Sequence, residues 1–302
     1  MIKNFIKWNN YHLDILQSPK PKCITKIGTT EAVYISEHIK TNGESYNPKS
    51  YGLNMSCGVY CKDKDSHNLW CKSYLSGIKT SDYLHLFHEA NFKRLGGPNR
   101  AKRLENQWTD SFIYNKIKNE MNLSHEPTSD LDFVIMPFGL MKDAWHYNLK
   151  NKKILVVSSS EKSFRYQAKR FDKIWDGAEL GGFEFVKIPS SEYLTKDNTN
   201  NQLEWCKKVE NAKEEISKKD FDFAMLGCGG IGLVLIDFIK NQLGKSCTYL
   251  GGSLQLYFGI RGNRWENSKN GWYNSNEYWI KTFEEDIPKN YKIHENGSYW
   301  VK

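Results

Sequence analysis

Apolar and polar positions follow a regular pattern in the second half of the chain. Short runs rich in apolar, β-branched and aromatic residues predict strands over 153–157, 183–188, 220–226 and 247–250. The stretches between them predict helices over 161–175, 203–218 and 232–243. Strands that alternate with helices indicate βαβ units. The sequence therefore predicts an α/β fold with a Rossmann-like parallel sheet flanked by helices. Right-handed crossovers place the loops that follow the strands along one edge of that sheet.

The first half of the chain gives weaker signals. An apolar run predicts a strand over 23–27, then a turn at Gly28-Thr29-Thr30 and a helix from Glu31 to about residue 40. Either threonine can cap that helix, and a glutamate suits its positive first turn. Residues 41–65 are expected to be rich in loops, and 131–136 to form a buried strand that ends at a proline.

The chain length allows two arrangements of these elements. Its 302 residues suffice for one large domain or for two smaller ones. We expect residues 1–145 to form an N-terminal α/β half that carries the threonine-bearing turn and the acceptor or sugar side. Residues 146–302 are expected to form the nucleotide-binding half, and the two halves could also make one continuous domain.

The net charge of the chain indicates which classes of ligand it can bind. A formal net charge of +8 fits a ligand that carries phosphates. The positive charge is spread along the chain without a basic block or tail, so a nucleic acid partner is not expected, and much of the charge can be solvated surface. No apolar run reaches about 18 residues and residues 1–10 do not form a signal peptide, which predicts no membrane span and a cytoplasmic location.

The seven cysteines form no CxxC pair. Cys57, Cys61 and Cys71, with His67 between them, could ligate zinc, but their spacings match no familiar zinc motif. Free thiols in a reducing compartment are the preferred interpretation.

The clearest motif is a run of glycines after the third strand of the regular region. Gly227, Gly229, Gly230 and Gly232 stand between a predicted strand and a predicted helix, in a G-x-G-x-x-G pattern. Such glycines let backbone amides approach a phosphate at a helix N-terminus, or they permit close packing of strand and helix. The next strand ends without an acidic residue for a ribose, which disfavours NAD and S-adenosylmethionine.

A second glycine turn follows the fourth strand. Gly252 is followed by Ser253 and Gln255, and then by a stretch that contains Arg261, Arg264 and Trp265. Arginines can neutralise phosphate charge and a tryptophan can stack on a base or a sugar. The alternative is a capped helix with the tryptophan in the core and the arginines in solvent.

These segments resemble a known family. The resemblance is densest over 140–265 and rests on the run from Asp220 to Trp265, on Asp143-Ala-Trp-His, on 149–157, on Gln167, Arg170 and Trp205, and on the ending 295–300. These segments are similar to bacterial and viral proteins of polysaccharide biosynthesis, a group that resembles glycosyltransferases of the GT-D fold. The resemblance implies a GT-D-like fold, a nucleotide-sugar donor and a glycan acceptor as partners.

The resemblance also assigns a role to the early turn. The family has a Gly-Asp-Gly-Glu turn whose acids serve a metal-bound sugar nucleotide, and this chain has Gly28-Thr29-Thr30-Glu31. Glu31 matches the second acid, whereas Thr29 replaces the first. The resemblance thus implies Glu31 as catalytic residue and metal ligand for a divalent cation, Mn or Mg, which the threonine puts in doubt. Alternatively, Glu31 only begins a helix.

These observations combine into a hypothesis of sugar transfer. Glu31 would act as base or ligand, and His146 is a secondary base candidate, although a lone histidine is often structural. The turn at 227–232 with Arg264 would hold the diphosphate, while Ser253 and Gln255 would orient the sugar. The sequence predicts a glycosyltransferase that moves a sugar from a nucleotide-diphosphate sugar to a glycan or polysaccharide. The alternatives are an S-adenosylmethionine-dependent methyltransferase and a catalytically degenerate sugar-nucleotide-binding protein.

Two weaker signals remain. His85, His88 and Glu89 lie close in sequence, but the pattern lacks a further metal ligand at a familiar spacing. Ser158, Ser159 and Ser160 follow a strand and can either cap a helix or contact phosphate, and capping is the default interpretation.

Overall fold

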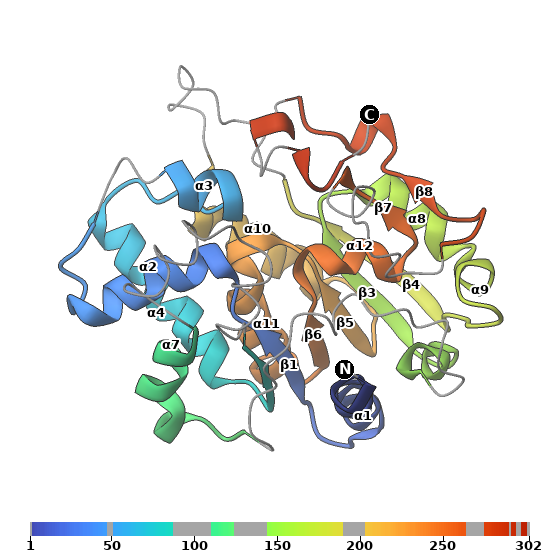
Figure 1. The fold of residues 1–302 in the computed structure, drawn as a ribbon, viewed down its shortest axis with the longest axis horizontal. Coiled ribbons are helices and arrows are strands. Elements are labelled where there is room, and N and C mark those ends of the chain that lie inside the picture. Colours follow the sequence, from blue (N-terminus) through green and yellow to red (C-terminus); the bar gives the residue numbers. More distant parts are fainter. Residues whose placement is uncertain are drawn as a thin grey trace.

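A six-stranded parallel sheet forms the centre of the protein (Figure 1). The computed structural model describes residues 2–46, 51–86, 110–123, 144–189, 203–263, 275–289, 291–293 and 297–300. The strands are β1 (Cys23–Lys26), β2 (Tyr83–His85), β3 (Lys153–Ser158), β4 (Gly182–Lys187), β5 (Phe223–Leu226) and β6 (Ser246–Tyr249). Their order across the sheet is β2-β1-β6-β5-β3-β4, and every pair is parallel. The predicted α/β fold with a Rossmann-like sheet is confirmed.

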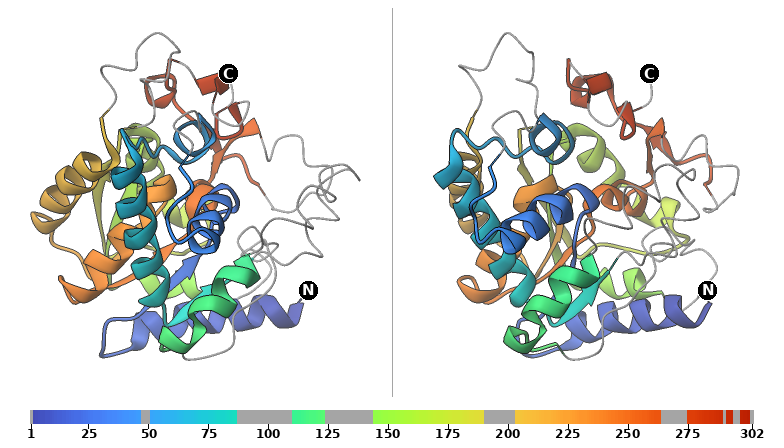
Figure 2. Two further views of the ribbon diagram at one scale, coloured as in Figure 1. Left: turned by 90° about the vertical axis from the view of Figure 1, so that its left-hand side faces the viewer. Right: turned by 60° about the vertical axis from the view of Figure 1, so that its left-hand side comes forward.

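Helices cover both faces of this sheet. They are α1 (Ile2–Gln17), α2 (Thr29–Lys40), α3 (Tyr51–Cys57), α4 (Lys64–Lys79), α7 (Asp110–Ile117), α8 (Glu161–Ala168), α9 (Phe171–Ile174), α10 (Trp205–Ser217), α11 (Gly232–Asn241) and α12 (Leu254–Tyr257). Short 3-10 turns include η4 (Trp145–Leu149), η6 (Gly229–Ile231) and η7 (Gly251–Ser253). A small parallel pair, β7 (Ile260–Arg261) and β8 (Ile280–Lys281), lies beside the main sheet. Figure 2 shows the C-terminal segments at the end of the molecule opposite α1.

Alternation along the strands divides the interior into two cores. In β3, Leu155 and Val157 join one core, with apolar residues of α4, α10 and α11. Ile154 and Val156 join the other, with residues of α1, α8 and α12. Successive side chains of a strand point to opposite faces, so a continuous apolar run requires cover on both sides.

The observed elements differ from the predictions in two places. The stretch 41–65 contains α3 and the start of α4, whose N-cap Asp63 accepts a hydrogen bond from the Ser66 amide at 2.7 Å. The single helix expected over 161–175 is split into α8 and α9, because Arg170 between them has a non-helical backbone. The strand expected over 131–136 lies outside the described residues.

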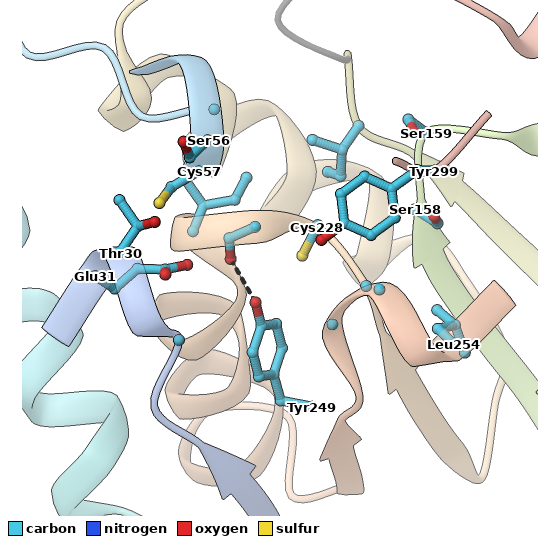
Figure 3. A pocket seen from close by; sticks show the side chains of 18 of the residues that line it. Thr30, Glu31, Ser56, Cys57, Ser158, Ser159, Cys228, Tyr249, Leu254 and Tyr299 are labelled. Atoms are coloured by element: carbon cyan, nitrogen blue, oxygen red, sulfur yellow. Dashed lines mark hydrogen bonds between the residues drawn. The ribbon is translucent and has the colours of Figure 1, made fainter. Parts of the chain in front are cut away.

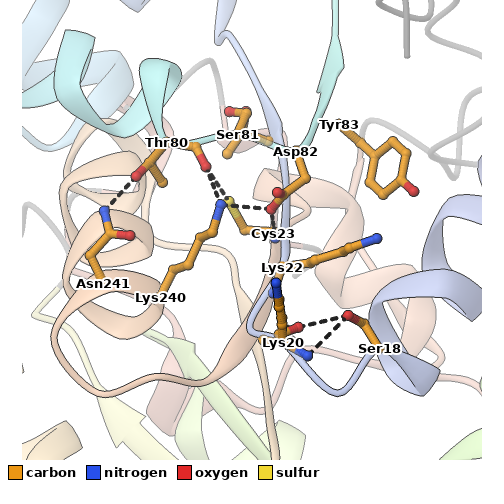
Figure 4. A network of polar contacts seen from close by, with 12 residues as sticks. Ser18, Lys20, Lys22, Cys23, Thr80, Ser81, Asp82, Tyr83, Lys240 and Asn241 are labelled. Carbon is orange, nitrogen blue, oxygen red and sulfur yellow. Dashed lines mark hydrogen bonds and ion pairs between the residues drawn. The ribbon is translucent and has the colours of Figure 1, made fainter. Parts of the chain in front are cut away.

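Strands from both halves of the chain lie in one sheet. β1 pairs with β6 in parallel, with Cys23 opposite Cys247. A polar network reinforces this junction (Figure 4). The ammonium of Lys240 in α11 donates to the Asp82 carboxylate at 2.7 Å, and that carboxylate also accepts from the Cys23 amide at 2.7 Å. In the part of the chain that the structure describes, no helix combines the length and apolarity that a membrane crossing requires.

Candidate functional site

A cavity lies where the carboxyl ends of β1, β3, β5 and β6 meet. The chain leaves β3 toward β4 at one edge of the sheet and leaves β5 toward β6 in the opposite direction. Open parallel sheets bind ligands in the crevice at such a reversal. The cavity volume is about 240 Å³, whereas one water molecule needs roughly 10–15 Å³ on the same measure. The space therefore suits a small organic ligand.

The threonine-bearing turn forms one side of this cavity. Gly28, Thr29, Thr30 and Glu31 all line it. Figure 3 shows Thr30 and Glu31 on one side, with Ser158, Ser159 and Tyr299 across from them. The Glu31 carboxylate folds back over Gly28, where any Cβ atom would overlap it. Only glycine at position 28 leaves room for this orientation of the acid.

Two buried tyrosines surround Glu31. Burial raises the pKa of Tyr74 and of Tyr249 well above the ordinary value, and the charge of Glu31 raises both further. Both phenols therefore stay protonated over the physiological range. The Tyr74 hydroxyl accepts from the Gly28 amide at 3.2 Å, and the Tyr249 hydroxyl donates to the Gly229 carbonyl oxygen at 3.0 Å. The first bond ties the early turn to α4, and the second ties the glycine-rich turn to β6.

The glycine-rich turn lies on the same cavity. Gly227, Cys228 and Gly229 line it at the end of β5. Gly229 has a φ of +61°, and a Cβ atom there would overlap the carbonyl oxygen of Cys57. A side chain at this position would thus displace α3 before it met a ligand.

The later glycines of the motif serve packing. A Cβ atom at Gly230 would lie 2.7 Å from the Val59 side chain, and one at Gly232 would overlap the ring of Tyr249. Neither glycine lines the cavity. The two interpretations of the motif therefore divide along the turn: its first residues face the cavity, and its last ones allow close packing.

The second glycine turn and the C-terminus complete the cavity wall. Gly251, Gly252 and Gln255 line it together with Tyr299 and Trp300. The ring of Tyr299 occupies the place that a Cβ atom of Gly252 would need, and the Gln255 amide donates to the Tyr299 carbonyl oxygen at 3.3 Å. This part of the wall therefore combines the amide side chain of Gln255 with the aromatic ring of Tyr299.

Several predicted residues lie elsewhere. Ser253 is buried beside the cavity and does not line it. Arg261 lies in β7, outside the cavity lining. Arg264 and Trp265, like His88 and Glu89, lie outside the described residues. Ser158 and Ser159 line the cavity, and Ser160, the N-cap of α8, makes no side-chain cap hydrogen bond.

The structure does not place His146 as a catalytic base. Its ring is 1% exposed and packs against Trp175 and Phe171 in the core, away from the cavity lining. Burial lowers its pKa to about 3, so it stays neutral in the folded protein. A histidine in such an aromatic core contributes to packing.

Two lysines that the sequence analysis missed line the cavity, Lys26 and Lys208. Lys26 ends β1, one residue before the threonine-bearing turn begins at Gly28. Lys208 lies on α10 in register with Trp205, Val209 and Ala212, which are all buried. A lysine on the apolar face of a predicted helix was the available signal, because ordinary lysines lie on the polar face.

The described residues do not form a dedicated metal site. Glu31 is the only carboxylate in the described lining of the cavity, and Thr29 beside it carries no charge. No group of three or more His, Cys, Asp or Glu side chains in the described part of the chain could hold a metal ion. Near the zinc candidates, the Cys71 thiol lies 3.8 Å from Nε2 of His67, and burial raises the thiol's pKa.

Comparison of the chain with protein-family models, with curated proteins and with solved structures finds no match.

Proposed function

We propose that this protein is a glycosyltransferase that moves a sugar from a nucleotide-diphosphate sugar to a glycan or polysaccharide acceptor. One observation carries the proposal: Glu31 and the glycine-rich turn, about 200 residues apart in sequence, line one cavity at the carboxyl edge of the sheet. Two lysines line the same cavity. An acid, a backbone turn and cations are the groups that transfer from a diphosphate leaving group requires.

Each group has a role in this mechanism. The acceptor hydroxyl oxygen forms a bond to the anomeric carbon of the donor, and its proton passes to the Glu31 carboxylate. The bond between the anomeric carbon and the diphosphate oxygen breaks, and that oxygen keeps the electron pair. The turn at Gly227–Gly229 and the lysines face the charge that develops there. Gln255 and Thr30, which both line the cavity, would orient the sugar.

The cavity lining also bears on the alternatives. S-adenosylmethionine carries a sulfonium cation, which two lysines in one cavity would repel. A catalytically degenerate sugar-nucleotide-binding protein keeps support from Thr29, which replaces the first acid of the family turn.

Titration with UDP, GDP, UDP-sugars and S-adenosylmethionine separates these functions. We expect a nucleoside diphosphate or its sugar to bind and S-adenosylmethionine not to bind; binding of S-adenosylmethionine alone would overturn the proposal.

Replacement of the proposed base tests catalysis separately from binding. Glu31→Gln keeps the size of the side chain and removes its ability to take a proton. We expect sugar transfer to fall about 100-fold or more, while the Kd of the donor stays within about threefold.

The matched control is Glu161→Gln, which also changes a first-turn glutamate of a helix that follows a strand, but lies outside the cavity lining. This control should transfer sugar at the wild-type rate. Full turnover by Glu31→Gln would remove Glu31 from the mechanism. Donor binding without transfer across a broad acceptor panel would favour the degenerate binding protein.

A further inference from the structure

Lys208 is an unusual residue in the cavity wall. Only 6% of its surface is exposed, and its ammonium donates one hydrogen bond, to the Gly58 carbonyl oxygen at 3.0 Å. Within the described part of the chain, no carboxylate pairs with this ammonium. The neighbouring Lys207, in contrast, forms an ion pair with Glu210. Burial alone lowers the pKa of Lys208, to about 8, so that it still carries its charge at neutral pH.

A buried cation of this kind requires a counter-charge. An ammonium has three donors, and a single carbonyl oxygen satisfies one of them. Desolvation of an unpaired ion is costly, and proteins ordinarily offset it with an opposite charge. Because Lys208 lines the cavity, an anionic ligand there would supply both the charge and the missing acceptors.

Lys26 provides a second cation from another element. Its side chain lies across the turn at Gly251, where a Cβ atom would come within 2.9 Å of the lysine Cε. Gly251 has a φ of +56°, so the turn favours glycine for its backbone as well. The described lining thus holds two ammonium groups and one carboxylate, Glu31, and favours an anion over a cation.

We propose that Lys208 and Lys26 hold the diphosphate of the donor directly and take the place of a divalent cation, so that binding and transfer need no metal. This inference rests on the proposed function for the identity of the ligand. It follows from the donor set, because the described lining offers a metal one carboxylate and offers a diphosphate two ammonium groups. When the anomeric bond breaks, the electron pair stays on the diphosphate, and the two cations compensate its added charge.

Lys208 could instead serve only to cap α3 through Gly58, and the experiment must separate these roles. The variants are Lys208→Met, which keeps an unbranched stem without charge, and Lys208→Arg, which restores the charge. Lys207→Met is the matched control, because Lys207 lies next to it on α10 with 58% of its side chain exposed. Circular dichroism checks that each variant is folded.

The probes are inorganic pyrophosphate and UDP, titrated by calorimetry at about pH 7 in EDTA and again with MnCl2. We expect the wild-type Kd in EDTA to match that in manganese within about twofold. Lys208→Met should weaken both probes about 10- to 100-fold, the range that a charge-assisted hydrogen bond contributes. Lys208→Arg should recover part of this loss, and Lys207→Met should bind like the wild type.

Two results would overturn the inference: loss of UDP binding in EDTA, or equal affinity of Lys208→Met and Lys207→Met. Should Lys208→Met fail to fold, Lys26→Met in EDTA decides by the same criterion.

Failure of the proposed function would give results different from failure of the lysine site. If pyrophosphate binding depends on Lys208 but no sugar is transferred, the lysine site stands and the transferase does not. If transfer requires manganese and ignores Lys208, the transferase stands without the lysine site.

Discussion

Glu31 and Lys208 are both charged residues on a largely buried wall, and their surroundings differ. Glu31 lies beside Tyr74 and Tyr249, whose hydroxyls stay protonated because burial and the acid's charge raise the pKa of both. Lys208 has a carbonyl oxygen as its hydrogen-bond partner and a pKa that burial lowers. The acid therefore lies near two phenols that stay neutral beside it, whereas the cation is held at a cost to the folded state.

That cost gives a stability prediction for Lys208→Met. A pKa of about 8 against an ordinary 10.5 corresponds to a penalty of roughly 3 kcal/mol for the charged form. The variant avoids this penalty but loses the hydrogen bond to Gly58, which costs it about 1 kcal/mol. We expect Lys208→Met to raise the free energy of unfolding at about pH 7 by roughly 2 kcal/mol, as measured by urea denaturation. A variant that binds ligand less well yet is more stable would identify a functional residue.

The pH dependence of this gain has a definite sign. Below about pH 8, Lys208 is protonated in both states and the penalty is fully present. Between that pH and about 10.5, the unfolded chain binds more protons than the folded one, so wild-type stability rises relative to the variant. The advantage of Lys208→Met should therefore shrink above about pH 8. A variant less stable than the wild type at neutral pH would show that Lys208 stabilises the fold.

At the scale of elements, the sequence predicted what short-range patterns determine. β3 was readable because its apolar run requires burial on both faces, and α2 because a turn precedes it. α3 was missed because its seven residues are too few for a periodic signal, and it is held by contacts with the glycine-rich turn. The break between α8 and α9 at Arg170 was missed as well. Gln167 just before it donates to the Gly259 carbonyl oxygen at 3.0 Å, a long-range contact that no local pattern reveals.

A close crossing of α4 and α11 gives a prediction of its own. Gly77 faces Leu233, and a Cβ atom at Gly77 would overlap the Leu233 carbonyl oxygen, which is backbone and cannot turn aside. We expect Gly77→Ala to destabilise the protein by about 2–4 kcal/mol, because the new methyl group forces the two helices apart. Helix propensity alone would favour alanine by about 1 kcal/mol, so a loss of stability identifies the clash. Urea denaturation measures the change.

The control for this crossing is Gly182→Ala, where the nearest atom to a new Cβ is the flexible Lys153 side chain at 3.1 Å. It should change stability by less than about 1 kcal/mol. If Gly77→Ala is as stable as this control, the two helices can separate without loss and the crossing does not restrict the residue at position 77.

At the scale of the whole molecule, the candidate site exists only because segments far apart in sequence share one sheet edge. The sequence indicated Glu31 and the glycine-rich turn separately, and the order β1-β6-β5 brings both onto one cavity. Lys208 reaches that cavity from a helix that packs on the sheet face. No local pattern encodes the neighbours of a strand when about 200 residues separate them. The apolar face of α10 could mark Lys208 as unusual, but the sequence could not place either lysine on this cavity.

The ion pair between Asp82 and Lys240 joins the two halves of the chain and carries the last prediction. Its side chains are 17% and 16% exposed, and Asp82 also holds the Cys23 amide at the start of β1. Asp82→Asn leaves a half-buried ammonium without its carboxylate, so we expect a loss of about 1–3 kcal/mol in the free energy of unfolding. Lys240→Met should lose a similar amount, and the double variant should lose less than the sum, with a coupling of about 1 kcal/mol.

The exposed pair Lys150–Glu179, at 65% and 51% exposure, should show a coupling near zero in the same cycle. Equal couplings for the two pairs would mean that the pairing of β1 with β6, and not this ion pair, holds the N-terminal strands in the sheet.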